Sequence, residues 1–438
     1  MKNIFLSIIG IFSCSLVIFS QSYTGHTVDN FAGIHGVIYN PANVVASNLR
    51  ADINLISTSV LIDNDYLGLG IGNIADIGDE FDDSLERFKS DANNFNINAD
   101  ILGPSFMFNL NKKNSIAFTS RVRVMSNINN INGELFETIA DDFGDEDDFD
   151  FDNQNFVGTA HAWAEICLSY GRILISKPKH LLTGGVTVKY LQGAGGAFTK
   201  ANSLEGNYNG STELLQSNGL LTYGTSSDFD LDDIEFDNLT AGFGLDIGFV
   251  YEWHPNRKDE ETRYFQDPYK LKIGVSITDI GSINYDNGEV TTYDMNNTVD
   301  TSTYEDDLQE FLDNNYDSTI QSQSTSFQLP TALHLLLDYR LAKKWLISAQ
   351  ADLSVVATDE QLNNAISNTI TLMPRFESKW FSLYAPVSLR QYGGFNAGAG
   401  LRFGPLSIGS GSILSNLLSD STQSADVFFG LKIPLYRK

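Results

Sequence analysis

Acidic and histidine side chains are the residues of this sequence whose types and spacing could do chemistry. Asp148, Asp150 and Asp152 stand at alternate positions, and carboxylate oxygens are the hard ligands that Ca²⁺ prefers. The run has Asn153 where a calcium-binding EF-hand loop needs glycine, and Thr159 where it needs a bidentate glutamate. A solvated acidic loop is therefore the favoured interpretation, and we expect neither a cofactor nor a bound metal.

Catalysis by a histidine-activated nucleophile is the second chemistry to consider. His161 or His334 could activate a serine, as in outer-membrane lipases, but neither lies in a recognisable nucleophile motif. The glycine-rich run 193–196 is no phosphate cradle, because no strand–helix context follows it. The sequence therefore predicts that the protein is not an enzyme.

Charged side chains recur within segments of alternating polarity, where they point to one side of a strand. Mixed charges in a narrow lumen normally form a structural network, since an unpaired charge removed from water is costly. The predicted inward-facing set is Arg121, Arg123, His161, Glu165, Lys189, Asp246, Glu252, Lys272, His334, Asp338, Arg340, Asp352, Arg375, Glu377, Arg390 and Arg402. A role of this network in binding or conduction is the alternative.

The element that positions such side chains is clearest in the last segment, residues 425–436. Apolar residues at odd positions from Val427 to Leu435 alternate with a mixed set that includes Lys432. This pattern is typical of a strand between hydrocarbon and a polar lumen. Such a strand near the end of the chain favours closure of a barrel against the first strand.

Similar alternation returns in about fourteen segments, each near the roughly 9–11 residues that a tilted strand needs to cross a bilayer. The segments are 49–55, 102–110, 116–124, 159–170, 182–191, 242–253, 269–278, 332–341, 345–354, 370–377, 381–390, 394–403, 405–411 and 425–436. A soluble β-sandwich is the alternative, but aromatic residues such as Trp253 and Trp345 at the ends of the apolar faces favour a membrane girdle. The predicted fold is all-β, a closed antiparallel transmembrane β-barrel of about 14 strands, within a range of roughly 12–16.

The start of the chain has the features of a secretory signal. Lys2 precedes an apolar run that ends at Ser20, which predicts a signal peptide over 1–20. Lipidation at Cys14 is disfavoured because the bulky Phe12 precedes it. Without the signal only Cys167 remains, so no intramolecular disulfide can form.

The connections between strands differ in length and charge. Short ones carry lysines, whereas four long ones, 63–96, 126–156, 192–238 and 280–326, hold most of the 55 acidic residues. Outer-membrane barrels have short periplasmic turns and long external loops, so we expect both termini on the periplasmic side. The net charge of −27 then belongs to the outer surface and disfavours nucleic acid as a partner.

Apolar residues at helical spacing occur within the long connections, around Ile77–Phe88, Leu135–Phe143 and Leu308–Leu312. They predict short amphipathic helices at the barrel mouth. A cargo-binding rim is the alternative.

Several short segments resemble outer-membrane barrels of Bacteroidota, within the superfamily of the long-chain fatty-acid transporter. They are 39–43 (Y-N-P-A-N), 102–106, 185–193, 244–248, 278–281, 404–406 and the closing strand. The chain is most similar to a barrel family of that phylum known only as a domain of unknown function. In fatty-acid transporters the segment with N-P-A folds into the lumen. The resemblance therefore implies a hatch at 21–48, around Asn40, Pro41 and Ala42, followed by a barrel over 49–438.

Two functions follow from the resemblance. One is passive uptake of small hydrophobic compounds across the outer membrane, helped by glycines such as Gly242, Gly244 and Gly248 that could thin or kink the wall. The other is a non-transporting accessory barrel of a cell-envelope machine, of the kind that serves type IX secretion or gliding. The implied partners are outer-membrane lipid and either a hydrophobic small molecule or envelope proteins.

Overall fold

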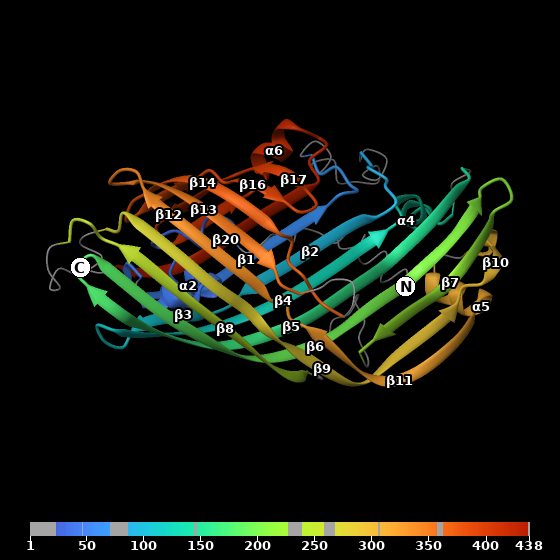
Figure 1. Ribbon diagram of the computed structural model, residues 1–438, viewed down its shortest axis with the longest axis horizontal. Coiled ribbons are helices and arrows are strands. Elements are labelled where there is room, and N and C mark those ends of the chain that lie inside the picture. Colours follow the sequence, from blue (N-terminus) through green and yellow to red (C-terminus); the bar gives the residue numbers. More distant parts are fainter. Residues whose placement is uncertain are drawn as a thin grey trace.

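The strands of this protein form one antiparallel sheet that closes on itself (Figure 1). The computed structural model describes residues 23–45, 47–70, 86–143, 147–226, 239–257, 268–304, 307–356 and 362–436. The predicted signal peptide lies outside these residues. Closure occurs where β1 (Leu49–Asn64) pairs with β20 (Ser424–Tyr436), with Leu49 opposite Tyr436. Within the described ranges, no helix is long and apolar enough to cross a membrane.

Fourteen strands make the barrel wall, as predicted, and some of them are broken into two segments. The broken strands are β2 (Asn93–Leu102) with β3 (Ser105–Asn109), β15 (Phe381–Tyr384) with β16 (Val387–Arg390), and β17 (Gly394–Ala397) with β18 (Ala399–Phe403). The unbroken strands, besides β1 and β20, are β4 (Asn114–Ile131), β5 (Phe149–Lys177), β6 (His180–Asn209), β8 (Thr240–Trp253), β9 (Leu271–Asp294), β12 (Ala332–Arg340), β13 (Trp345–Ser354), β14 (Thr369–Glu377) and β19 (Leu406–Ser410). Each strand pairs with the next, so the wall is an up-and-down meander.

Side chains in the wall follow the alternation of the sequence. In β20, Leu431, Ile433 and Leu435 are exposed on the outer face, whereas Lys432 between them is fully buried inside. Because successive residues of a strand point to opposite faces, the apolar row covers the outside and the polar row lines the lumen. The sequence pattern and the structure agree here residue by residue.

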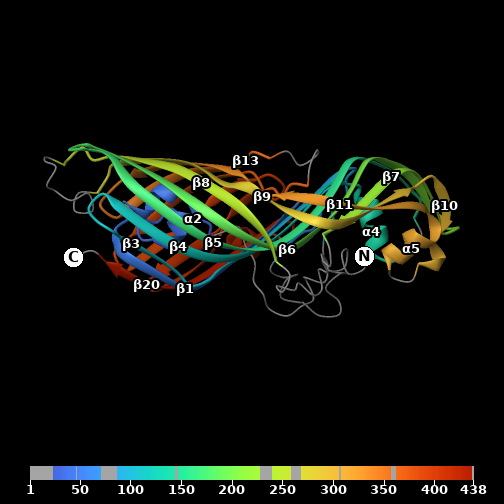
Figure 2. The same ribbon diagram turned by 90° about the horizontal axis from the view of Figure 1, so that it is seen from below.

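On one side of the barrel the strands continue well beyond a membrane crossing. β5 has 29 residues and β6 has 30. The chain then turns back as β7 (Leu214–Thr225), and β10 (Asn297–Asp300) and β11 (Asp317–Gln328) complete a curved sheet, called the extension below (Figure 2). The prediction of long loops over 126–156, 192–238 and 280–326 is therefore wrong for most of their described residues. It assumed that a strand ends where the bilayer ends.

Two short amphipathic helices cover the inner face of the extension, as predicted. α4 (Gly133–Ala140) begins after Asn132, whose side chain accepts hydrogen bonds from the backbone N–H groups of Glu134 and Leu135. α5 (Leu308–Asn315) begins in the same way after Asp307, and a single 3₁₀ turn, η3 (Thr301–Thr303), precedes it. The helix predicted around Ile77 lies largely outside the described residues.

The described N-terminal residues lie inside the barrel (Figure 1). They form α2 (Ile34–Tyr39) and a 3₁₀ turn, η1 (Pro41–Val44), and they contact strands around the wall. A further helix, α6 (Ile413–Leu418), connects β19 to β20 at the barrel end opposite to the described C-terminus.

Candidate functional site

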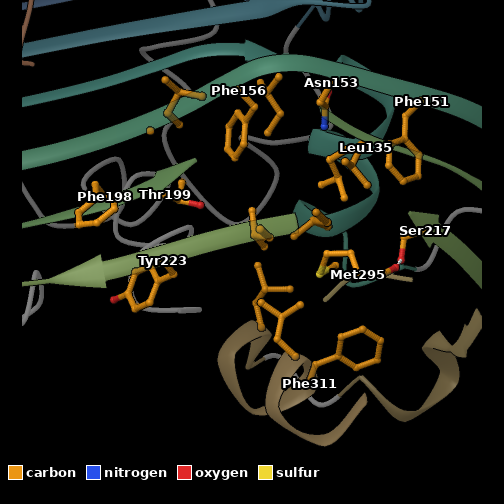
Figure 3. A pocket seen from close by; sticks show the side chains of 18 of the residues that line it. Leu135, Phe151, Asn153, Phe156, Phe198, Thr199, Ser217, Tyr223, Met295 and Phe311 are labelled. Atoms are coloured by element: carbon orange, nitrogen blue, oxygen red, sulfur yellow. Dashed lines mark hydrogen bonds between the residues drawn. The ribbon is translucent and has the colours of Figure 1, made fainter. Parts of the chain in front are cut away.

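An apolar cavity lies in the extension, between its curved sheet and the helices α4 and α5. Its volume is about 110 Å³. Figure 3 shows Leu135, Phe156, Phe198, Met295 and Phe311 among the side chains around it. These residues come from β5, β6, both helices and the segment before β10, so the cavity exists only because the extension folds as one unit.

Several of the polar groups at this cavity already have partners. Asn153 Oδ1 accepts a hydrogen bond from the backbone N–H of Asn132, at 2.6 Å. Ser217 Oγ donates to the carbonyl oxygen of Met295 at 2.7 Å and lies 2.9 Å from the Tyr316 hydroxyl. Burial raises the pKa of Tyr316, so this phenol stays neutral. A ligand here would therefore bind by apolar contact and shape.

An aromatic layer closes the cavity toward the barrel. The His161 ring stacks on Trp163 and Phe327, with ring centroids 4.8 and 4.9 Å away. His161 Nε2 lies 2.9 Å from the Tyr285 hydroxyl, and Phe198 joins this layer to the cavity lining. His161, predicted to face the lumen, is thus part of an aromatic layer and has no carboxylate partner among the hydrogen bonds that hold it.

A segment between β13 and β14, residues 362–368, folds inward and completes this layer. Asn96 and Asn127 side chains donate to the carbonyl oxygen of Ala365 at 2.6 and 3.0 Å, and the Ala365 N–H donates back to Asn127 Oδ1 at 3.1 Å. Asn364 Nδ2 lies 3.1 Å from His161 Nδ1. No pattern in the sequence predicts this segment, which we call the inward segment.

The inward segment separates the apolar cavity from a second, polar cavity of about 80 Å³. On one side, Thr159 lines the apolar cavity and its hydroxyl donates to the Asn363 carbonyl oxygen at 3.5 Å. On the other side, Ile366 lines the polar cavity together with Arg123 and Asp279. The two cavities therefore lie in series along the barrel, with one seven-residue segment between them.

All of the predicted inward-facing charged residues are buried or half-buried in the wall. The largest cluster consists of Arg121, Arg123, Lys189, Asp100, Glu165, Asp246 and Asp279. Lys189 Nζ lies 3.0 Å from Asp246 and 2.5 Å from Asp279, and Arg123 lies 2.8 Å from Asp279. Each cation faces at least one carboxylate, which offsets the cost of burying it.

A second group of predicted residues binds the N-terminal segment. Arg375 Nη2 lies 2.6 Å from Asp338, and its Nε lies 3.2 Å from Glu377. Glu377 in turn accepts hydrogen bonds from the backbone and side chain of Asn30, at 2.8 and 2.7 Å. Arg402 Nε donates to Asp29 at 2.9 Å. These charges therefore connect the wall to residues 29 and 30.

The other predicted residues form separate contacts. Glu252 lies 3.1 Å from His254 and 3.7 Å from Lys272, and Arg390 lies 2.7 Å from Asp426. Arg340 donates to the carbonyl oxygens of Tyr269 and Lys343. The predicted set is thus several clusters, and a binding or conducting role for it stays a prediction.

His334 belongs to a hydrogen-bonded chain that resembles the order of a nucleophilic triad. His334 Nδ1 lies 2.7 Å from Asp352, and Nε2 lies 2.9 Å from the Thr278 hydroxyl. Such a site also needs free donors for an oxyanion, but the backbone N–H that follows Thr278 donates to Asp246 at 2.7 Å. This geometry favours a structural hydrogen-bond chain, and the absence of an enzymatic activity stays a prediction.

The turn at Asn40, Pro41 and Ala42 lies in a notch of the wall. Gly171, Gly185 and Gly248 face each other across three neighbouring strands, and Ser276 follows on the fourth. A Cβ at Gly185 would lie 2.4 Å from the Pro41 carbonyl carbon, and one at Gly248 would lie 2.2 Å from Asn40 Oδ1. The wall therefore has room for this turn only because the three glycines lack side chains.

Asn40 also binds the wall directly. Its Nδ2 donates to the carbonyl oxygens of Phe249 and Val275, at 3.2 and 3.1 Å, and its Oδ1 accepts from the Ala42 N–H at 3.0 Å. Of the glycines predicted to thin or kink the wall, Gly248 has a packing role, because it makes room for Asn40. β8 pairs with β6 from Thr240 to Trp253 without a register shift.

The described part of the acidic run, from Asp147 onward, does not gather into a metal site. Asp150 and Asp152 lie exposed on β5, so the expected loop is wrong from Phe149 onward. Asp148 accepts hydrogen bonds from Asn209 and the Gly210 N–H. Across the described ranges, no group of three or more His, Cys, Asp or Glu residues could hold a metal ion. The expectation that no cofactor is needed stays a prediction.

Some buried charged groups were missed by the sequence analysis. Asp426 follows the alternation of the closing strand and could have been found from it, as the inward position of Lys432 was. Asp279 could not, because it has a φ of +58° beside a register shift between β8 and β9, where the alternation breaks. Asp29 lies in a segment without periodicity.

Comparisons with known proteins give a family and a set of similar folds. The profile of a family of unknown function (DUF5723) matches residues 41–411. No curated protein matches the chain. Similar solved structures include the toluene transporter TbuX of Ralstonia pickettii (8% identity, 93% of this chain and 95% of that chain covered, TM-score 0.43). A second is the toluene transporter TodX of Pseudomonas putida (10% identity, 95% of this chain and 98% of that chain covered, TM-score 0.43). A third is a FadL homologue of Pseudomonas aeruginosa (11% identity, 95% of this chain and 98% of that chain covered, TM-score 0.41).

Proposed function

We propose that this chain, which belongs to the DUF5723 family, is an outer-membrane barrel that takes up small hydrophobic compounds passively. The apolar cavity of the extension carries the proposal. It is lined mostly by aliphatic and aromatic side chains, several of its polar groups already have partners, and it lies in series with a polar cavity inside the barrel.

Membrane insertion follows from the outer surface of the wall. Leu372, Leu389 and Phe395 are examples of outward-facing apolar side chains that are at least half exposed. A soluble protein rarely exposes a continuous apolar band of this kind, whereas a barrel in a bilayer needs one. The short basic turns and the described C-terminus lie at the same end, which we assign to the periplasmic side.

The size of the cavity suggests the size of the compound. A cavity of about 150 Å³ in an engineered protein holds one benzene molecule, and the present one is about 110 Å³. In this conformation it suits a compound near the size of a single aromatic ring. Passage onward requires the inward segment and then the N-terminal segment to move, because both lie between the apolar cavity and the periplasmic end.

Filling the cavity tests this function. Ala160 lines it, and Ala160→Leu places a larger side chain into the space. Uptake of radiolabelled toluene by cells that carry the variant should fall toward the rate of cells without the gene. Ala349→Leu on β13 adds the same atoms on the exposed outer face and serves as the control. Equal uptake by both variants would contradict the proposal, provided both show heat-modifiable migration.

A second candidate function is an accessory barrel of an envelope machine. One edge of β11 favours it: β11 pairs with β9 on one side, and along 317–327 no described strand pairs with the other side. A free strand edge can pair with an extended segment of another protein. Purification in mild detergent, with mass spectrometry of bound lipids and proteins, separates the two functions. A stoichiometric protein partner without a hydrophobic ligand would favour this second candidate.

A further inference from the structure

The helix α6 has its polar side toward the protein and its apolar side outward. Leu414, Leu417 and Leu418 are 40%, 59% and 86% exposed. Asn416 is buried, and its Nδ2 donates to the carbonyl oxygens of Leu69 and Ser424, at 2.7 and 2.9 Å. In Figure 1, α6 lies on the outside of the barrel, above β17.

Side chains of serine hold the same side of α6 to the barrel. The backbone N–H of Ala397 in β17 donates to Ser415 Oγ at 2.8 Å, and the N–H of Asp426 in β20 donates to Ser412 Oγ at 3.0 Å. A six-residue helix is not stable alone in water. It persists here because polar contacts to two strands fix its orientation, and this orientation leaves the leucines outside.

This arrangement is the reverse of an ordinary surface helix. In water, a helix that packs on a protein buries its apolar stripe and exposes polar residues. Leu418 and Leu417 could face outward at little cost only if an apolar medium covers them. The exposed face of α6 therefore points to an apolar partner.

The neighbouring surface shows which apolar partner this is. Phe395 on β17 and Leu389 on β16 are 62% and 60% exposed on the outer face of the wall, and α6 contacts β17 directly. The exposed leucines are thus continuous with the band that we assign to the bilayer. A stable protein interface buries roughly 1,200–2,000 Å², more than three leucine side chains can supply, which disfavours a protein partner.

We propose that α6 is an interfacial anchor that inserts its leucines among the acyl chains of the outer leaflet. The proposal rests on the proposed membrane placement and adds a specific lipid contact on the side of the barrel that lacks the extension. The strands next to α6 are short, with four residues in β16 and in β17. Fixed at the membrane surface on this side, α6 would hold the barrel at one depth while the extension stands in water on the other side.

Fluorescence quenching by lipids tests the anchor. In a Cys167→Ser background, the variants Leu418→Cys, Phe395→Cys and Ile320→Cys are labelled with the environment-sensitive dye NBD and reconstituted into phosphatidylcholine vesicles. Phosphatidylcholine with a doxyl group on its acyl chain is the quencher. Phe395 reports on the lipid band, and Ile320, 62% exposed on β11, reports on the extension. Heat-modifiable migration identifies folded protein.

The anchor predicts strong quenching at positions 418 and 395, little at 320, and a blue-shifted emission at 418. Adding Leu417→Ser should weaken the quenching at 418 without changing that at 395. Quenching at 395 but not at 418 would overturn the anchor and leave the membrane placement intact. No quenching at either position would overturn both. A disulfide-linked dimer of the unlabelled Leu418→Cys variant, without quenching, would assign the surface to a second copy of the chain.

Discussion

Gly185 and Pro41 are in such close contact that a Cβ on the glycine would lie 2.4 Å from the Pro41 carbonyl carbon and 2.5 Å from the Ala42 nitrogen. Gly171 lies directly opposite Gly185 in the sheet, and a Cβ there would lie 2.4 Å from a Val44 methyl group. The barrel wall and the N-terminal segment are thus shaped to each other. Substitutions at this contact should separate the position of the segment from the stability of the barrel.

Gly185→Ala should displace the N-terminal segment. The new methyl group meets backbone atoms, which cannot rotate away, and overpacking of this kind costs about 1–3 kcal/mol. We expect faster proteolysis of residues 23–45 and a higher single-channel conductance, with the barrel still heat-modifiable. Gly184→Ala on the same strand is the matched control, because the atoms nearest to its new methyl group belong to the side chains of Leu174 and Phe249 and not to the backbone. Identical proteolysis of the two variants would contradict the packing argument.

Deletion of residues 21–48 should open the barrel to ions. In the full chain, Arg402 binds Asp29, Glu377 binds Asn30, and Lys432 Nζ donates to the carbonyl oxygens of Phe31 and Ala32 at 2.7 and 2.6 Å. Without the segment these charges require water, which fills the lumen. Planar-bilayer recordings should show little conductance before the deletion and a steady channel after it. A large, steady conductance of the full-length protein would show that the segment is no hatch.

Lys432→Met should destabilise the folded barrel more than any surface substitution. It removes the cation that lies 3.4 Å from the buried Asp52 carboxylate, and an uncompensated buried charge costs about 3–5 kcal/mol. Asp52 also accepts a hydrogen bond from the Ile34 N–H, so the change should loosen the N-terminal segment as well. The measurement is the midpoint of urea unfolding in detergent. Lys432→Met/Asp52→Asn removes both charges and should recover part of the loss; no recovery would argue against charge burial as the cause.

More of the fold than of the candidate site could be predicted from the sequence. Alternation in segments such as 425–436 shows both faces of a strand at once, so the strand number, the outer band and most lumen-facing charges followed from it. The two cavities did not. Contacts such as Asn127 to Ala365 join residues 238 positions apart, in a segment without periodicity, and no local pattern encodes them. Strand length was also underestimated, because a strand was assumed to end at the edge of the bilayer, whereas β5 and β6 continue into the extension.

Asn127→Ala should loosen the inward segment. Asn127 makes two hydrogen bonds to the backbone of Ala365. Removing a hydrogen bond so that a buried donor or acceptor stays unsatisfied costs about 1–3 kcal/mol of stability. Toluene uptake should rise if the segment limits passage between the cavities. Asn129→Ala on the same strand removes a bond to the Tyr392 hydroxyl instead and is the control. Lower uptake by Asn127→Ala, with normal folding, would mean that the segment forms part of the binding site.

Asp307 should make ligand binding by the extension sensitive to acid. Its carboxylate accepts hydrogen bonds from the backbone N–H groups of Glu310 and Gln309 at the start of α5, and these bonds hold its pKa below the ordinary value. A carboxylate with a lowered folded pKa stabilises the fold above its unfolded pKa of about 3.9, and this contribution is lost as the pH falls through the folded pKa. Asp307→Ala should cost about 0.5–2 kcal/mol of helix stability at neutral pH. Toluene binding by the detergent-solubilised variant should then be weaker at pH 7 than that of the native protein. Its affinity should also fall less on acidification below pH 4.

The control is Asp317→Ala, at an exposed position of β11, which should bind toluene as the native protein does at every pH. Equal acid sensitivity of the native protein and Asp307→Ala would exclude this cap as the titrating group.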